Sequence, residues 1–313
     1  MTKTDLVSKF MGGMIGSAVG DAIGEIAFQH RSADALLREV QQTRPLIYTD
    51  DTAMAIGIAE SLIERGELDH QHLGDTLRRN YEREPWRGYA MNPPTIFNIC
   101  RQTGVSYLQA ARSAFGGIGS YGNGAAMRIT PIGLFYYDAE DIRPPAAASA
   151  QVTHTHPLGI EGAVLLACAI AQAVRLDPEK DFPEKDFLWR LRDIAETPEF
   201  ESKIALMEDL LADRADAATA ARELGTDVTA VGSVPFAIYS FLMHPKSFKD
   251  CLLHAVVVPG DSDTLGAMAC AISGAYLGIE AVPQDWVDRL ENREHIETLA
   301  RRLAEIKKEE AGM

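Results

Sequence analysis

The stretch "PGDSDTLGAMACAISGAYLG", residues 259–278, decides the fold and raises the question of function. Its apolar residues recur at spacings of three and four, which predicts a helix over 264–278. That helix is apolar all round, so it must lie in a layer that other helices cover. Two carboxylates, Asp261 and Asp263, stand directly before its fifteen uncharged residues.

Helical periodicity dominates the whole chain, and alternating β-type runs are almost absent. It predicts apolar helices over 10–25, 52–66, 156–174, 234–244 and 248–258, and amphipathic charged helices over 69–83, 186–196, 199–223 and 283–309. Glycines are spaced along two of the apolar helices, at Gly12, Gly13, Gly16, Gly20, Gly266, Gly274 and Gly278. Glycine in a helix costs ~1 kcal/mol against alanine, so close helix packing or function must compensate. We predict an all-α fold.

We expect a single domain over 1–313, although a chain of 313 residues is long enough for two. No shift in composition divides it. The segment 177–187 resembles a solvated loop and Pro144–Pro145 indicates a bend, but both are too short to link domains. The motifs fall within 12–280, and 281–313 is expected to form charged C-terminal helices.

Composition excludes several function classes. The net charge of −15 repels nucleic acid phosphates, so we expect no nucleic-acid partner. The longest apolar runs fall short of the ~20 residues that span a bilayer, and the start lacks a secretory leader, so we expect no membrane association. The cysteines lack pairing spacings, which indicates free thiols in a reducing compartment and predicts a cytoplasmic location; they are Cys100, Cys168, Cys251 and Cys270.

A second acidic helix start precedes the apolar run at 52–66. It contains Thr49, Asp50, Asp51 and Thr52. Capping explains one such residue per helix, because a side-chain oxygen there accepts from the first backbone N–H groups. Pairs of carboxylates at two buried helix starts would instead repel one another unless a cation neutralised them. Oxygen ligands favour Mg²⁺, Mn²⁺ or Ca²⁺ over Zn²⁺. The spacing alone leaves a shared metal site and excess capping equally open.

A glycine-dense segment, "FGGIGSYGNGAAMRITPIG" at 115–133, suggests a phosphate-bearing ligand. Exposed N–H groups of such a loop can cradle a diphosphate before a helix that we expect near Ala125. Phe115 and Tyr121 are candidates to stack on a base, and Ser120 and Asn123 to bind a ribose or phosphate. A glycine-rich turn without function is the alternative.

Two histidines follow in "QVTHTHPLG" at 151–159. An H-x-H pair can ligate zinc, but the acidic segments offer no matching ligands. We expect His154 to contact a substrate and His156, which precedes Pro157, to be structural.

Taken in order, the motifs resemble the ADP-ribosylglycohydrolase family. The matching pieces are "GSAVGDAIGEIAF", "YTDDTAMAIGIAESL", "GSYGNGAAMRITPIGL", "THTHP" and "HAVVVPGDSDTLGAMACAISGAYLG". The resemblance implies a single compact orthogonal helical domain and hydrolysis of the bond between the anomeric carbon of ADP-ribose and a protein side chain, arginine or serine, or a related conjugate. It also implies two divalent cations, Mg²⁺ or Mn²⁺.

Matched motif by motif, the resemblance assigns residues to roles. The implied metal ligands are Thr49, Asp50, Asp51, Asp261, Asp263 and Thr264. The implied substrate contacts are Phe115, Gly119, Ser120, Tyr121, Gly122, Asn123 and His154.

The general acid or base is where this chain departs from the family. Many members carry a glutamate a few residues after the G-D-x-x-G turn, but Phe28 stands there in this chain. Glu25, directly after Gly24, is the displaced candidate, and Asp263 or Asp51 acting on a metal-bound water is the alternative. Asp21 is expected at a helix end, in a packing or supporting role. Pro259 replaces a common glycine and should stiffen the approach to Asp261.

Three functions compete at this stage. The first is a metal-dependent ADP-ribosylhydrolase, with an ADP-ribosylated protein or ADP-ribose conjugate as partner. The second is a catalytically impaired ADP-ribose-binding regulatory protein. An unrelated metal phosphohydrolase explains the acids but not the glycine-aromatic loop. We expect a monomer, and the sequence does not select the acceptor residue.

Overall fold

The computed structural model describes residues 5–310, and it confirms an all-α fold. Within that range no β-strand forms; two isolated bridges join Leu46 to Leu290 and Gly122 to Thr229. The helices of the first half are α1 Leu6–Ala27, α2 Ala33–Gln42, α3 Asp50–Arg65, α4 His70–Arg83, α5 Asn92–Thr103, α6 Tyr107–Ser113, α7 Thr130–Phe135 and α8 Arg143–Ala150.

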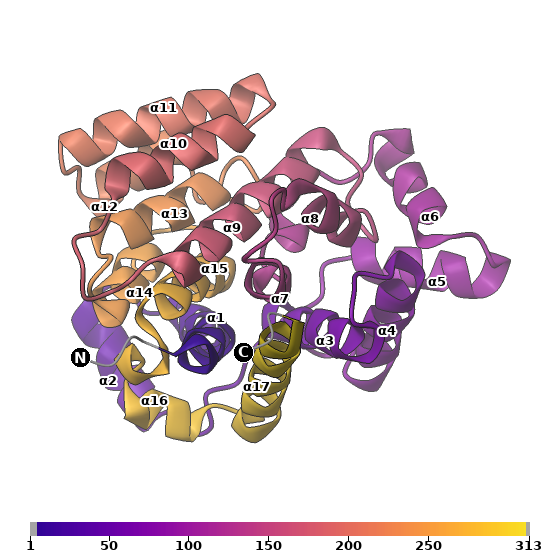
Figure 1. Ribbon diagram of the computed structural model, residues 1–313, viewed down its shortest axis with the longest axis horizontal. Helices are drawn as coiled ribbons and strands as arrows, with labels where there is room; N and C mark the ends of the chain where they lie inside the picture. The colour runs from indigo at the N-terminus through magenta and orange to yellow at the C-terminus, as the bar shows by residue number, and fades with distance from the viewer. Residues whose placement is uncertain (1–4, 311–313) are drawn as a thin grey trace.

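The second half continues the helical array around a shared core. Its helices are α9 Pro157–Arg175, α10 Glu184–Ile194, α11 Pro198–Ala212, α12 Ala217–Leu224, α13 Val234–Met243, α14 Phe248–Val256, α15 Ser262–Leu277, α16 Gln284–Arg289 and α17 Arg293–Glu310. In Figure 1, α3–α6 gather on one side of the molecule and α10–α14 on the other, with α9 crossing between them. One continuous hydrophobic core connects the two sides, as a single domain requires.

The pairing of α1 with α15 is the most extensive helix contact among the described elements. Four glycines of α1 lie against the backbone of α15; the closest approaches are Gly12 on Gly274, Gly20 on Gly266 and Gly24 on Ser262. A Cβ atom at these positions would overlap backbone atoms of the partner helix. Helix–helix packing therefore explains most of the glycines that the sequence shows on both helices, whereas Gly278 ends α15 with a positive φ of 89°.

Two predicted helices are each divided in two. The range 199–223 breaks between α11 and α12, where Arg214 takes a positive φ of 48° and Asp216 caps α12 by accepting from Thr219 N at 2.8 Å. The range 283–309 breaks between α16 and α17 at Asn292, whose φ is 55°. These local conformations stop a helix even though the apolar spacing continues across the gap.

Prolines and short helices account for other differences. Pro144 and Pro145, predicted as a bend, lie in the first turn of α8, where a missing N–H costs nothing. The helix expected near Ala125 is only a 3₁₀ turn over Asn123–Ala125. The predicted helices omit α2, α5, α6, α7 and α8.

The apolar helix α9 is long and apolar enough to cross a membrane by length and composition alone. However, 78% of its most apolar window is buried inside the protein, as in the core helix of a globular fold. The cysteines are free thiols; Cys168, Cys251 and Cys270 are buried, and Cys100 is half-buried.

Candidate active site

The two acidic helix starts meet in the structure. Asp50 and Asp51 occupy the first turn of α3, and Thr49 is its N-cap. Asp261 is the N-cap of α15 and Asp263 lies in its first turn. The hydroxyl of Thr264 donates to both carboxylate oxygens of Asp51, at 3.2 and 3.1 Å, and so joins segments 213 positions apart.

Asp21 supports this junction from inside the core. It lies within α1 rather than at a helix end, and it is fully buried. Its carboxylate accepts from the N–H and hydroxyl of Thr49, at 3.0 and 2.8 Å, and from the same groups of Thr52, at 3.0 and 2.6 Å. The hydroxyl proton of Thr49 is thus directed at Asp21, which leaves oxygen lone pairs for its predicted role as a ligand.

Burial and mutual repulsion raise the pKa values of these carboxyl groups. The pKa of Asp50 rises to about 7, first by burial and then by the charge of Asp21. The pKa of Asp263 rises to about 8, by burial and then Asp261, and that of Asp51 rises well above its ordinary value, by burial and then Asp263. Asp21 reaches about 6 through burial, against four stabilising hydrogen bonds.

The chemistry of this cluster fits oxygen-ligated divalent cations. Carboxylate and hydroxyl oxygens that repel one another in a buried place are what Mg²⁺ or Mn²⁺ neutralises. Among residues 5–310, however, no three Asp, Glu, His or Cys side chains are already arranged as a ligand shell. Asp51 turns toward Thr264, so side chains must rotate before they close around a cation.

The glycine-rich loop lies against the same cluster. Its backbone turns through Gly119, with a φ of 80°, and Gly122 N donates to Ser120 Oγ at 3.2 Å. The Asn123 side chain donates to Asp261 Oδ2 at 2.7 Å. The structure therefore places Asn123, predicted as a substrate contact, on a predicted metal ligand.

The aromatic side chains of this loop are exposed. Phe115 is 62% exposed and has a positive φ of 53°, and Tyr121 is 50% exposed with its ring edge-on to His156 at 5.5 Å. Their exposure is compatible with the predicted stacking on a base. His156 also caps α9 by accepting from Leu158 N at 3.2 Å, in agreement with a structural role.

His154 lies beneath the loop, and its ring is 3% exposed. Its Nδ1 is 2.7 Å from the hydroxyl of Thr153. A Cβ atom at Gly124 would lie 3.2 Å from its Nε2, so the glycine leaves this nitrogen uncovered. Burial, and then the charge of Arg128, lower the pKa of His154 to about 3.

Glu25 reaches the site from the last turns of α1. It is exposed, and it follows Gly24, where a Cβ would lie 2.6 Å from Asp263 Cα. The charge of Glu25 contributes to the raised pKa of Asp263. Phe28, at the family's glutamate position, is 38% exposed and lies 5.8 Å from the Arg31 guanidinium.

The segment 226–233, which no sequence motif marks, links the glycine loop to α15. Thr226 O accepts from Asp261 N at 2.8 Å, and its hydroxyl donates to Pro259 O at 2.6 Å. Val228 O accepts from Asn123 N at 3.0 Å. Backbone groups make most of this connection, so no side-chain pattern in the sequence indicates it.

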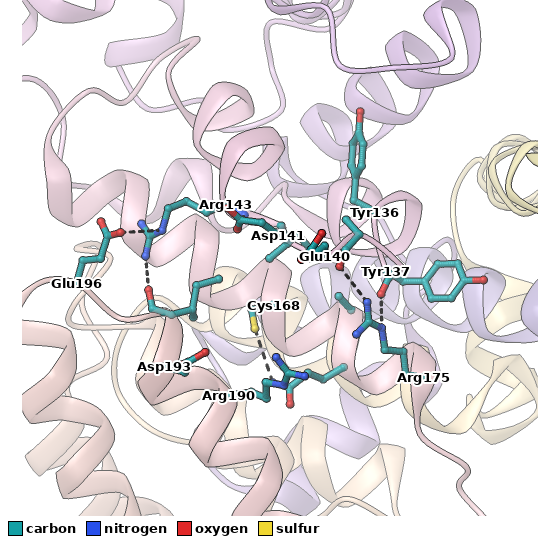
Figure 2. A pocket seen from close by; sticks show the side chains of 15 residues that line it. Tyr136, Tyr137, Glu140, Asp141, Arg143, Cys168, Arg175, Arg190, Asp193 and Glu196 are labelled. Carbon is teal, nitrogen blue, oxygen red and sulfur yellow. Dashed lines mark hydrogen bonds and ion pairs between the residues drawn. The ribbon is translucent and has the colours of Figure 1, made fainter.

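A separate hollow of about 370 Å³ lies between the segment 136–143, α9 and the end of α10 (Figure 2). None of the predicted site residues lines it. Arg143 pairs with Glu196 at 3.1 Å and donates to the Ile194 carbonyl, and Arg175 donates to the Ala139 carbonyl at 3.1 Å. These guanidinium groups brace loops and are not aimed at a shared ligand.

Comparison with known proteins gives a consistent result. The family model for ADP-ribosylglycohydrolase matches residues 2–311. The chain is 32% identical to human "ADP-ribosylhydrolase ARH3" over 96% of this chain and 94% of the relative. It is 26% identical to "ADP-ribosyl-[dinitrogen reductase] glycohydrolase" of Rhodospirillum rubrum over 93% of each chain. A solved "ADP-ribosylglycohydrolase-related protein complex" shares the fold, with a TM-score of 0.74, 24% identity and coverage of 96% and 99%.

Proposed function

This chain belongs to the ADP-ribosylglycohydrolase family, and we propose that it is a metal-dependent hydrolase that releases ADP-ribose from a protein side chain or a related conjugate. The observation that carries the proposal is the junction of three segments. Thr264 binds Asp51, and Asn123 binds Asp261. The glycine-rich loop, to which we assign the diphosphate, is thereby joined to a carboxylate cluster, to which we assign the distal ribose.

In this proposal, different parts of the site bind different parts of ADP-ribose. The loop from Gly119 to Asn123 holds the diphosphate, and Phe115 and Tyr121 flank the adenine. Cations held by the Asp50–Asp51 and Asp261–Asp263 pairs would polarise the ribose hydroxyls and lower the pKa of a bound water. The proposal includes two ions, Mg²⁺ or Mn²⁺.

The reaction replaces one bond at the anomeric carbon. Water adds to that carbon while the bond to the acceptor nitrogen or oxygen breaks, through an oxocarbenium-like transition state. In this proposal Glu25 takes a proton from the water and returns it to the leaving atom; its support is that its charge acts on Asp263. Asp263 is the alternative base, since burial and Asp261 raise its pKa to about 8.

The test follows free ADP-ribose. The protein is incubated with Mg²⁺ or Mn²⁺ and with mono-ADP-ribosylated arginine and serine peptides, and the acceptor that releases ADP-ribose identifies the substrate class. Binding of ADP-ribose without release from any acceptor would favour the regulatory binder. A cytoplasmic location and a monomeric state stay predictions, checked by cell fractionation and by analytical ultracentrifugation.

Variants assign the roles within this test. We expect Asp261→Ala and Asp50→Ala to lose activity while the fold survives, and activity retained in both would contradict the metal assignment. Glu25→Gln should lose about 10²- to 10⁴-fold in rate with little change in ADP-ribose affinity. A fully active Glu25→Gln would move the proton transfer to Asp263. Asp209→Asn, an exposed carboxylate on α11, is the matched control.

A further inference from the structure

Arg128 is a fully buried cation beside the candidate site. Its Nη2 donates to the hydroxyl of Thr153 at 2.8 Å and to the Ser149 carbonyl at 3.4 Å, and its Nη1 faces Met54 Sδ at 3.7 Å. Among the residues that the structure describes, no carboxylate forms an ion pair with it, and its Nε has no partner. Burial lowers the pKa of Arg128, and the charge of Asp50, which acts on it from further away, raises that pKa by less. A buried guanidinium whose Nε is unsatisfied is costly, which points to a specific role.

The hydrogen bonds that join Arg128, Thr153 and His154 determine which ring nitrogen of His154 carries the proton. Arginine only donates, so the Thr153 oxygen must accept from Arg128. Thr153 is fully buried, and His154 Nδ1, at 2.7 Å, is the one described acceptor for its own hydroxyl proton. If Nδ1 carried a proton instead, the Thr153 O–H would be buried without a partner. All of these hydrogen bonds can form only if Nδ1 of His154 is unprotonated and accepts from Thr153. The imidazole proton is then on Nε2.

The protonated nitrogen points toward the glycine-rich loop. A Cβ atom at Gly122 would lie 3.7 Å from His154 Nε2, and one at Gly124 would lie 3.2 Å from it. Within residues 5–310 no acceptor pairs with this N–H. This N–H is a donor without a described protein acceptor, and it lies beside the glycine-rich loop, so it is suited to an anionic oxygen bound there.

We propose that Arg128 and Thr153 are positioning residues that fix His154 in its Nε2–H tautomer, so that the neutral imidazole donates to a diphosphate oxygen of the ligand on the glycine loop. The ligand in this inference rests on the proposed function; the tautomer does not. Because the pKa of His154 is about 3, the ring stays neutral at working pH. The direction of its hydrogen bond, not its charge, then determines what it recognises.

Nitrogen NMR of protein labelled with ¹⁵N-histidine measures the tautomer directly, with His154→Gln to assign the signal. We expect the Nε2–H form for His154. The chain supplies its own control, because Ser240 Oγ donates to Phe236 O at 2.9 Å and must accept from His254 Nδ1 at 3.0 Å. His254 should therefore show the opposite, Nδ1–H form. An Nδ1–H signal for His154 would overturn the proposal.

Variants at Thr153 connect the tautomer to binding. Thr153→Val keeps the branched shape but removes the hydroxyl, so we expect a mixed tautomer and an ADP-ribose affinity at least tenfold lower by calorimetry. Thr153→Ser should restore both, and Thr298→Val, which removes an exposed helical hydroxyl, should change neither. Unchanged affinity and tautomer in a folded Thr153→Val would contradict the relay.

The outcomes separate the two proposals. An Nε2–H signal in a wild-type protein that does not bind ADP-ribose would overturn the ligand and hence the proposed function, while the tautomer itself stands. Tight ADP-ribose binding with an Nδ1–H signal would overturn the relay alone. The wild-type spectrum decides this point even where Thr153→Val does not fold.

Discussion

Asp21 and Asp51 are both buried carboxylates, but they differ in how far hydrogen bonds offset their loss of water. Asp21 accepts four hydrogen bonds from Thr49 and Thr52, which offset part of that loss, although burial still raises its pKa to about 6. Among the described residues Asp51 accepts only from Thr264, and four neighbouring carboxylates raise its pKa further. Without a cation, the charge of Asp51 is therefore the less compensated of the two, and Asp21 connects α1 to the start of α3.

The first prediction concerns Asp51→Asn. In EDTA we expect this variant to be more stable than wild type by about 1–3 kcal/mol, because a buried charge disappears while the bond from Thr264 can persist. Stabilisation by Mg²⁺, which would reach about 2.7 kcal/mol at a hundred times Kd, should be largely lost. Thermal unfolding with and without Mg²⁺ measures both, with Asp209→Asn as control. Equal Mg²⁺ stabilisation in variant and wild type would show that Asp51 is not a ligand.

The second prediction concerns Asp21→Asn. An amide offers one acceptor oxygen where four donors converge, so at least one donor becomes unsatisfied. We expect a loss of about 2–4 kcal/mol in the free energy of unfolding, measured with urea. A loss below about 1 kcal/mol would mean that Asp21 does not organise the start of α3.

At this scale the sequence predicted the residues better than their contacts. The acidic pairs were found because two charges before an apolar helix exceed what capping needs. The sequence did not indicate Arg128 and Thr153, because it does not distinguish a buried arginine from an exposed one. Asn123 looked like a substrate contact, and only the fold shows that it reaches Asp261.

The pairing of α1 with α15 is the element that brings the site together. It carries Asp21 and Glu25 on one helix and Asp263 on the other. Backbone contact at the glycines sets the distance between these helices. The separation of the acids thus depends on residues that have no side chain.

The third prediction tests this contact. In Gly274→Ala the new methyl group would overlap the Gly12 carbonyl, which cannot move without shifting α1. We expect a loss of about 3 kcal/mol or more, and lower Mg²⁺ affinity in whatever folds. Gly57→Ala on α3 is the matched control, since its methyl group meets the flexible end of Leu77 at 2.9 Å. Similar unfolding midpoints for the two variants would contradict the packing role.

Helix boundaries were predictable where apolar periodicity was long. The predictions for α3, α4, α9, α13 and α15 match closely, since each is strongly periodic. Short helices such as α6 and α7 offer too few turns for a pattern to emerge. The break before α12 depends on the backbone of Arg214, which apolar spacing does not record.

Across the whole molecule, buried histidines determine part of the response to acid. His254 has its Nδ1 3.0 Å from Ser240 Oγ and stacks on Phe236 at 5.8 Å, and its Nε2 is buried without a partner. Burial, and then the charge of His244, lower its pKa to about 4, while Asp216 opposes the shift. Between that value and the ordinary 6.5, the unfolded chain binds the proton more readily.

The fourth prediction follows from this sign. The stability contributed by neutral His254 is complete above about pH 6.5 and is lost as the pH falls toward 4, up to about 3 kcal/mol. Urea unfolding of wild type and His254→Gln at pH 7.5, 6 and 5 isolates the effect, because the acidic cluster contributes equally to both. Wild type should lose stability faster, and parallel curves would contradict the assignment.

The all-α single domain was predictable as a whole because periodicity, composition and motif order agreed. The contacts that join distant segments at the site were not predictable. The segment 226–233 connects the glycine loop to α15 through carbonyl and amide groups, which every residue has. The hollow of Figure 2 likewise arises from how loops pack, and no motif marks it.

The partnership of α1 and α15 also has a consequence for biosynthesis. A ribosome makes α1 first, and some 250 residues later it makes the helix that covers the glycine face of α1. During that interval the apolar surface of α1 lacks its native partner, and the nascent chain is exposed to aggregation or capture by chaperones. Chains released before residue 277 should therefore be degraded rather than accumulate as partly active fragments. The two acidic helix starts would meet only after α15 has been made.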